Sequence, residues 1–182
     1  MNVTVYCGSH VGNDPAFERC AADVGAWIAR HGHTLVYGGG GVGLMGVVSG
    51  AVLDAGGRVV GVIPRFLLRT ERPNRELDEL HVTETMWERK MAMIELGDAF
   101  IALPGGPGTL EEITEVISLA KLSRVHGPVV LFDCNGYYQP LLAVYDDMVA
   151  SGFLSAEQRG RFCAIEQVDE LDGLLGRPRV DG

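Results

Sequence analysis

The chain has 182 residues, a mass of 19.6 kDa, 47% apolar and 21% charged side chains, which is the composition of one ordinary globular domain. This composition excludes collagen-like, disordered and coiled-coil proteins. Its formal net charge of −9 repels phosphate backbones and anionic lipids, so we expect no nucleic-acid partner and no membrane partner.

The cysteines and the start of the chain bear on its compartment. Cys7, Cys20, Cys134 and Cys163 lack CxxC or Cys/His spacing, which predicts buried free thiols, with no metal site and no disulfide framework. The first residues read directly as a strand, and no apolar run reaches the ~18 residues of a membrane span. We therefore expect a cytoplasmic protein.

Short apolar runs alternate with segments of helical periodicity along the chain. Expected strands are 3–7, 34–37, 58–63, 99–103 and 128–132, and expected helices are 15–31, 43–55, 86–96, 109–122 and 137–150, followed by short pieces of both kinds. Residues 64–80 are charged and are expected to be irregular and flexible. The pattern predicts an α/β fold: a three-layer open parallel sheet with helices on both faces, in one domain over residues 1–176 with a flexible tail at 177–182.

Three glycine-bearing turns follow strands, at Gly8-Ser9, 38–46 and 104–109. Ligands of such sheets bind at the carboxyl ends of the strands, and a glycine turn before a helix makes an anion site. The turn at Gly38, Gly40 and Gly43 matches GxGxxG, but Val62-Ile63-Pro64 stands where a dinucleotide fold has its acidic residue. A loop that needs glycine only for tight packing is the alternative. Neither turn continues as a Walker A motif.

The turn Pro104-Gly105-Gly106-Pro107-Gly108-Thr109 is followed by Glu111-Glu112. Its backbone and the Thr109 hydroxyl can hold a phosphate, with Glu112 one helical turn further on. Alternatively, Thr109 and Glu112 are spaced as a helix capping box. Arg89 shares helical spacing with Met86 and Met93, so it either snorkels outward or pairs with a buried anion such as Glu112 or a substrate phosphate.

Several motifs together resemble those of the LOG family, the cytokinin riboside 5′-monophosphate phosphoribohydrolases long labelled possible lysine decarboxylases. They are Tyr6-Cys7-Gly8-Ser9, Val36-Tyr37-Gly38-Gly39-Gly40, Gly43-Leu44-Met45-Gly46, Gly61-Val62-Ile63-Pro64, Glu88-Arg89-Lys90-Met91 and the turn from Pro104 to Glu112. The likeness runs from the first strand to Gly152-Phe153.

The resemblance implies a Rossmann-like, nucleotide-binding homodimer that cleaves the N-glycosidic bond of an adenine nucleoside 5′-monophosphate without a metal or cofactor. The family's catalytic pair falls on Arg89 and Glu112. Its substrate contacts fall on Ser9, Gly39, Gly40, Gly43, Met45, Glu71, Lys90, Gly105, Gly106, Gly108, Thr109 and Glu111. The chain departs from the family pattern at Trp87 and at Ser118–Ser123. These departures put the favoured base in doubt, but the expected reaction type stays the same.

Two other functions are open to test. A non-catalytic nucleotide-binding or carrier protein on the same fold would bind a nucleotide without turnover. A pyridoxal phosphate decarboxylase would need a lysine for its Schiff base, and Lys90 and Lys121 are the only two lysines in the chain.

Overall fold

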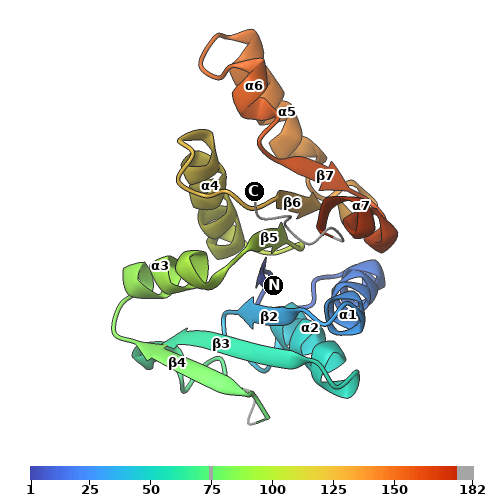
Figure 1. Ribbon diagram of the computed structural model, residues 1–182, viewed down its shortest axis with the longest axis vertical. Coiled ribbons are helices and arrows are strands. Elements are labelled where there is room, and N and C mark those ends of the chain that lie inside the picture. Colours follow the sequence, from blue (N-terminus) through green and yellow to red (C-terminus); the bar gives the residue numbers. More distant parts are fainter. Residues whose placement is uncertain (74–75, 176–182) are drawn as a thin grey trace, which may run out of the picture.

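The computed structural model describes residues 1–73 and 76–175, and these contain one seven-stranded sheet (Figure 1). Its strands are β1 (Asn2–Tyr6), β2 (Thr34–Tyr37), β3 (Arg58–Pro64), β4 (Glu79–Thr83), β5 (Ala99–Ala102), β6 (Val129–Phe132) and β7 (Cys163–Ile165). The strand order is β4-β3-β2-β1-β5-β6-β7, and every neighbouring pair is parallel. The expected tail at 177–182 lies outside the described residues.

Helices connect the strands and cover both faces of the sheet. They are α1 (Pro15–Arg30), α2 (Gly43–Asp54), α3 (Met86–Leu96), α4 (Pro107–Lys121), α5 (Gln139–Ala150), α6 (Ala156–Arg159) and α7 (Leu171–Leu175), with short 3-10 turns η1 (Arg65–Leu67), η2 (Cys134–Gly136) and η3 (Val168–Glu170). Figure 1 shows α1, α2 and α7 on one side of the sheet and α3 and α4 on the other. Within the described part of the chain, no helix has both the length and the apolar character that a membrane crossing needs.

Successive strand residues point to opposite faces, so the sheet divides the interior into two apolar cores. Val3 and Val5 of β1 belong to the core under α1 and α2, and Tyr6 belongs to the core under α3 and α4. Because both faces are covered, the strands read as continuous apolar runs rather than alternating ones. The predicted three-layer α/β sheet is confirmed.

The strand β4 was not predicted, because it lies in and beyond the segment that we expected to be irregular. It pairs with β3 from Val60–Glu79 to Pro64–Thr83 at the edge of the sheet. Its residues Glu79 to Val82 are exposed, so the sequence lacks the apolar pattern by which buried strands are recognised.

The expectation that all four cysteines are free is wrong for two of them. Cys20 on α1 and Cys134 in η2 form a disulfide across 114 residues of sequence. Cys7 and Cys163 are free, as predicted. Because the two bonded residues are brought together only by the packing of α1 against the segment after β6, their spacing gave no signal.

Candidate active site

A cavity of about 530 Å³ lies at the carboxyl ends of β1 and β5. These neighbouring strands lead to helices on opposite faces, α1 and α4, so the cavity sits where the strand order reverses, as expected for an open α/β sheet. Its wall consists of Cys7, Gly8, Ser9, His10, Val11, Gly12, Phe17, Leu44, Met45, Glu71, Met86, Arg89, Pro104, Gly105, Gly106, Pro107, Gly108, Thr109, Glu112 and Tyr137.

The loop after β5 forms one end of this cavity. The Gly8 N–H donates a hydrogen bond to the Pro104 carbonyl at 3.0 Å, which holds the turns after β1 and β5 together. Helix α4 begins at Pro107 with Gly106 as its N-cap, and no side chain of the described residues caps it. The first N–H groups of the helix therefore remain available to an anion.

The start of α4 decides between the two interpretations of Thr109 and Glu112. Thr109 is a buried residue inside the first turn, three positions after the N-cap. A capping box would need Thr109 itself at the N-cap, so that interpretation is wrong. The Pro at the first helical position, a common place for proline, was the signal for the earlier start.

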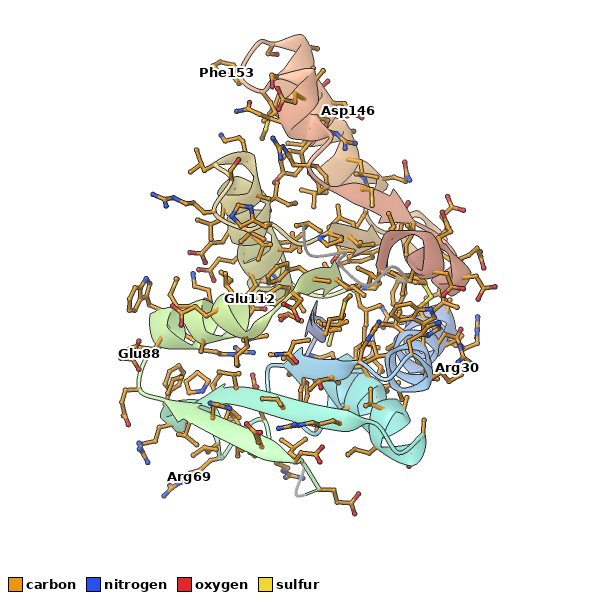
Figure 2. All side chains as sticks on the ribbon, in the orientation of Figure 1. Arg30, Arg69, Glu88, Glu112, Asp146 and Phe153 are labelled. Carbon is orange, nitrogen blue, oxygen red and sulfur yellow. A yellow bond between two sulfur atoms is a disulfide. The ribbon has the colours of Figure 1, made fainter. Side chains whose placement is uncertain are left out.

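Arg89 and Glu112 form an ion pair at the wall of the cavity. Thr85 and Glu88 form a capping box that starts α3, and Arg89 follows in the first turn on the inward face. Arg89 Nη1 lies 3.5 Å from Glu112 Oε1, and the two residues are only 7% and 8% exposed. Of the two predicted alternatives for Arg89, outward snorkelling or an internal partner, the structure has the internal partner. Figure 2 shows Glu112 near the centre of the molecule between α3 and α4, whereas Arg30, Arg69 and Phe153 lie at the periphery.

Burial dominates the electrostatics of Glu112. Loss of solvent raises the pKa of its carboxyl, the Arg89 guanidinium lowers it, and the charges of Glu111 and Glu71 raise it. A buried carboxylate interacts strongly with a positive charge that develops beside it, because the effective dielectric constant there is low.

The glycines of the turn after β2 make room for the side chains of the cavity wall. A Cβ on Gly38 would overlap the Arg89 guanidinium, and one on Gly43 would overlap the Ser9 backbone. A Cβ on Gly40 would lie 2.8 Å from Met45 Cε. The turn thus has the close packing that we considered as the alternative to dinucleotide binding.

Most of the predicted contact residues line the cavity. They are Ser9, Met45, Glu71, Gly105, Gly106, Gly108 and Thr109, together with Arg89 and Glu112. Gly39, Gly40 and Gly43 lie outside this wall. Lys90 and Glu111 also lie outside it, paired with each other across α3 and α4 at 2.9 Å, and Lys90 is also 3.0 Å from Glu115.

The lysines also bear on pyridoxal phosphate, which needs a lysine amine at the reacting centre. Lys90 is held by two carboxylates of α4 away from the cavity, and Lys121 is the last residue of that helix. The residues present do not fit this cofactor. The described residues also hold no group of three His, Cys, Asp or Glu side chains placed to bind a metal ion.

Several wall residues escaped the sequence interpretation. Tyr137, in the segment after η2, donates a hydrogen bond from its hydroxyl to the Gly105 carbonyl and packs edge-on against Phe17, with ring centroids 5.5 Å apart. His10 and Met86 also line the cavity. The rule that the carboxyl ends of parallel strands meet at one edge pointed to the segment after β6, but it did not select Tyr137 within it.

A family model described as possible lysine decarboxylase matches residues 45–173. The chain belongs to this family, the LOG family. The predicted resemblance is confirmed.

The LOG-family relatives cover nearly all of the chain. A probable cytokinin riboside 5′-monophosphate phosphoribohydrolase of Oryza sativa subsp. japonica is 45% identical over 169 residues, 93% of this chain and 76% of the rice protein. A cytokinin riboside 5′-monophosphate phosphoribohydrolase of Rhodococcoides fascians is 44% identical over 178 residues, 97% of this chain and 90% of that one.

Solved structures share the fold at lower identity. The molybdenum cofactor carrier protein of Chlamydomonas reinhardtii superposes with a TM-score of 0.72 at 20% identity, covering 97% of this LOG-family chain and 98% of the carrier protein. This likeness concerns the Rossmann-like architecture alone.

Proposed function

We propose that this chain hydrolyses the N-glycosidic bond of adenine-type nucleoside 5′-monophosphates, cytokinin riboside 5′-monophosphates or AMP, giving the free base and ribose 5-phosphate. The observation that carries the proposal is the buried Arg89–Glu112 pair, 3.5 Å apart, beside the open N-terminus of α4 in one cavity. Family membership and the names of the 44–45% identical relatives support the same reaction.

The loop at Gly105–Thr109 binds the 5′-phosphate in this proposal. Free N–H groups and the positive end of the α4 dipole favour an anion there, and the Thr109 hydroxyl adds a further donor. The phosphate is remote from the bond that breaks, so its binding energy positions the ribose without taking part in the bond cleavage itself.

Glu112 acts on the ribose one helical turn from the phosphate. Cleavage of an N-glycosidic bond places positive charge on the sugar ring, as in other glycoside hydrolysis. The Glu112 carboxylate stabilises that charge and accepts a proton from the water that attacks C1′. Arg89 favours the ionised form of Glu112 and orients it through the ion pair between them.

The test is release of free base, followed by chromatography, from AMP and from isopentenyladenosine 5′-monophosphate. We expect the wild type to release base from at least one of them, and the Glu112→Gln and Arg89→Ala variants to lose about 10²- to 10³-fold in kcat. The corresponding nucleosides, which lack the phosphate, are expected to react far more slowly.

Glu18→Gln and Arg161→Ala serve as matched controls, since both residues are exposed and lie outside the cavity wall. Nucleotide binding without base release would contradict the proposal and favour a non-catalytic binding protein.

The chain is also proposed to act as a cytoplasmic homodimer, and the expected dimer rests on its resemblance to the family. Light scattering on the eluted protein tests the assembly: a mass near 39 kDa, about twice the 19.6 kDa chain, is expected. A monomer mass across a range of protein concentrations would refute the dimer.

A further inference from the structure

A second carboxylate, Glu71, faces the cavity beside the Arg89–Glu112 pair. It comes from the segment after η1, whereas Arg89 and Glu112 come from α3 and α4, and all three side chains line the same cavity. Its Oε2 lies 3.5 Å from the position that a Cβ would take if Gly40 were alanine, and Met45 lies beside the same position. Glycosidic bond cleavage commonly uses two carboxyl groups, one as acid and one as nucleophile or base.

The backbone around Glu71 is fixed against the glycine turn after β2. The Gly41 N–H donates to the carbonyls of Glu71 and Arg72, each at 3.0 Å, and the Glu71 N–H donates to the Leu67 carbonyl at 2.9 Å. An antiparallel bridge joins Gly40 to Pro73. These bonds hold the segment on both sides of Glu71, so its side chain has a defined place in the wall.

The two carboxyl groups differ in their partners. Glu112 has Arg89 at 3.5 Å, whereas Glu71 takes part in no ion pair within 4.0 Å in the described part of the chain. Glu71 Oε2 and Glu112 Oε1 are both buried and, among the described residues, without a hydrogen-bond partner, so the ion pair with Arg89 is what distinguishes the two groups. A carboxyl group that is buried and unpaired favours its neutral form.

Charged and titratable groups surround Glu71 on several elements. They are Arg89 on α3, Glu112 on α4, the Cys7 thiol after β1, the Tyr37 phenol at the end of β2, and His10 on the cavity wall. Burial raises the pKa of Glu71 more than the Arg89 guanidinium lowers it. Burial raises the pKa of Glu112 as well, and Arg89 lowers it, so the two carboxyl groups differ in geometry: Arg89 forms its ion pair with Glu112, which favours the carboxylate there, and leaves Glu71 without a cationic partner within 4.0 Å among the described residues.

We propose that Glu71 is the general acid that protonates the leaving base, an inference that rests on the proposed hydrolysis. As the C1′–N9 bond breaks, its electron pair passes to the purine, and the carboxyl proton of Glu71 moves to a ring nitrogen of the base. Water adds to C1′ and gives a proton to Glu112. Transfer of one proton from Glu112 through solvent to Glu71 restores both groups, and the sum is nucleotide plus water giving base plus ribose 5-phosphate.

The sharpest test compares a leaving group that must be protonated, the purine base, with one that leaves as an anion, nitrophenolate. The Glu71→Gln variant keeps the shape of the side chain but has no acidic proton. We expect it to lower kcat for AMP by about 10²- to 10⁴-fold, and to leave kcat for p-nitrophenyl β-D-ribofuranoside 5-phosphate within about threefold, because nitrophenolate leaves without protonation. Glu112→Gln is expected to lower both rates. Glu95→Gln, an exposed substitution on α3, is the control.

The pH profile of the wild type is an independent measurement that needs no variant to fold. A general acid is lost as the pH rises through its pKa, so kcat for AMP falls on the alkaline side, and the raised pKa of Glu71 moves this fall toward neutral pH. The fall is expected to be absent with the nitrophenyl substrate.

The outcomes separate this inference from the proposed function. A wild type that releases no base from any nucleotide overturns the hydrolase and the role of Glu71 together. If the wild type is active, three results overturn the role of Glu71 alone. The Glu71→Gln variant could lower kcat equally for both substrates, or it could lower kcat for neither. It could also still show the decrease of kcat for AMP at alkaline pH.

Discussion

Gly105 sets the shape of the loop after β5 because it has no side chain. A Cβ at this position would overlap the Thr109 hydroxyl and lie 2.8 Å from the Gly8 nitrogen, and the Gly105 carbonyl accepts a hydrogen bond from Tyr137. Segments after β1, β5 and β6 therefore meet at one residue that has no room for a methyl group.

At this residue scale, we expect Gly105→Ala to displace the Thr109 hydroxyl and to raise the KM for AMP by about 10- to 100-fold, the loss of one hydrogen bond to a charged group. Initial rates against AMP concentration measure it. Gly50→Ala is the control, because a methyl group there would meet no atom within 4 Å. An unchanged KM for Gly105→Ala would show that this loop does not bind the phosphate.

Helices α1 and α2 support the cavity from one face of the sheet, and they approach each other closely at Gly25. A Cβ on Gly25 would lie 2.5 Å from the Val48 carbonyl oxygen and 2.9 Å from Ala51 Cβ. Both helices start directly after turns that shape the cavity, so their separation also sets the distance between the turns after β1 and β2.

At the scale of the element, Gly25→Ala is expected to lower the free energy of unfolding by about 1–3 kcal/mol, since overpacking must force the helices apart. Gly50→Ala, also within a helix but in open space, is expected to raise it by about 0.5–1 kcal/mol, because alanine loses less backbone entropy. Urea titration followed by circular dichroism measures both. Equal effects of the two substitutions would contradict the close packing at Gly25.

The sequence was informative where local chemistry decides the structure. Apolar runs predicted the buried strands, and helical spacing placed Arg89 on an inward face of α3. The sequence was uninformative where side chains are exposed, as in β4. It was also uninformative where contacting residues are distant along the chain, because Tyr137 reaches the cavity only through the packing of the segment after β6. The motifs of the LOG family gave most of the cavity wall, but spacing could not tell that Lys90 pairs with α4 rather than facing the cavity.

At the scale of the whole molecule, the Cys20–Cys134 disulfide ties the first helix to the segment after the sixth strand. The same segment carries Tyr137, which packs against Phe17 one turn before Cys20. The disulfide thus connects distant parts of the chain next to the cavity. It also lowers the conformational entropy of the unfolded chain, because it closes a loop of 114 residues.

We expect removal of this disulfide, by a reductant or by Cys20→Ala with Cys134→Ala, to lower the free energy of unfolding by about 2–4 kcal/mol. Thermal melting with and without reductant measures the change, and Cys163→Ala, which leaves the pair intact, is the control. Thiol titration of the unfolded, unreduced protein is expected to count two free thiols, the number left by one disulfide among four cysteines. A count of four would refute the pairing.

The strand order has a consequence for biosynthesis. β1 is made first, yet it lies between β2 and β5, and its register with β5 joins Val3 to Ala99. Until Ala99 and the rest of β5 have been synthesised, one edge of β1 is unpaired and the turn at Gly8 lacks the neighbouring loop after β5. The loop at Gly105–Thr109 follows β5 directly, so the pairing of β5 with β1 extends the sheet and also supplies the missing wall of the cavity. Non-local pairing of this kind is slow, and the ability to bind nucleotide should therefore appear in the growing chain together with the central pairing of the sheet.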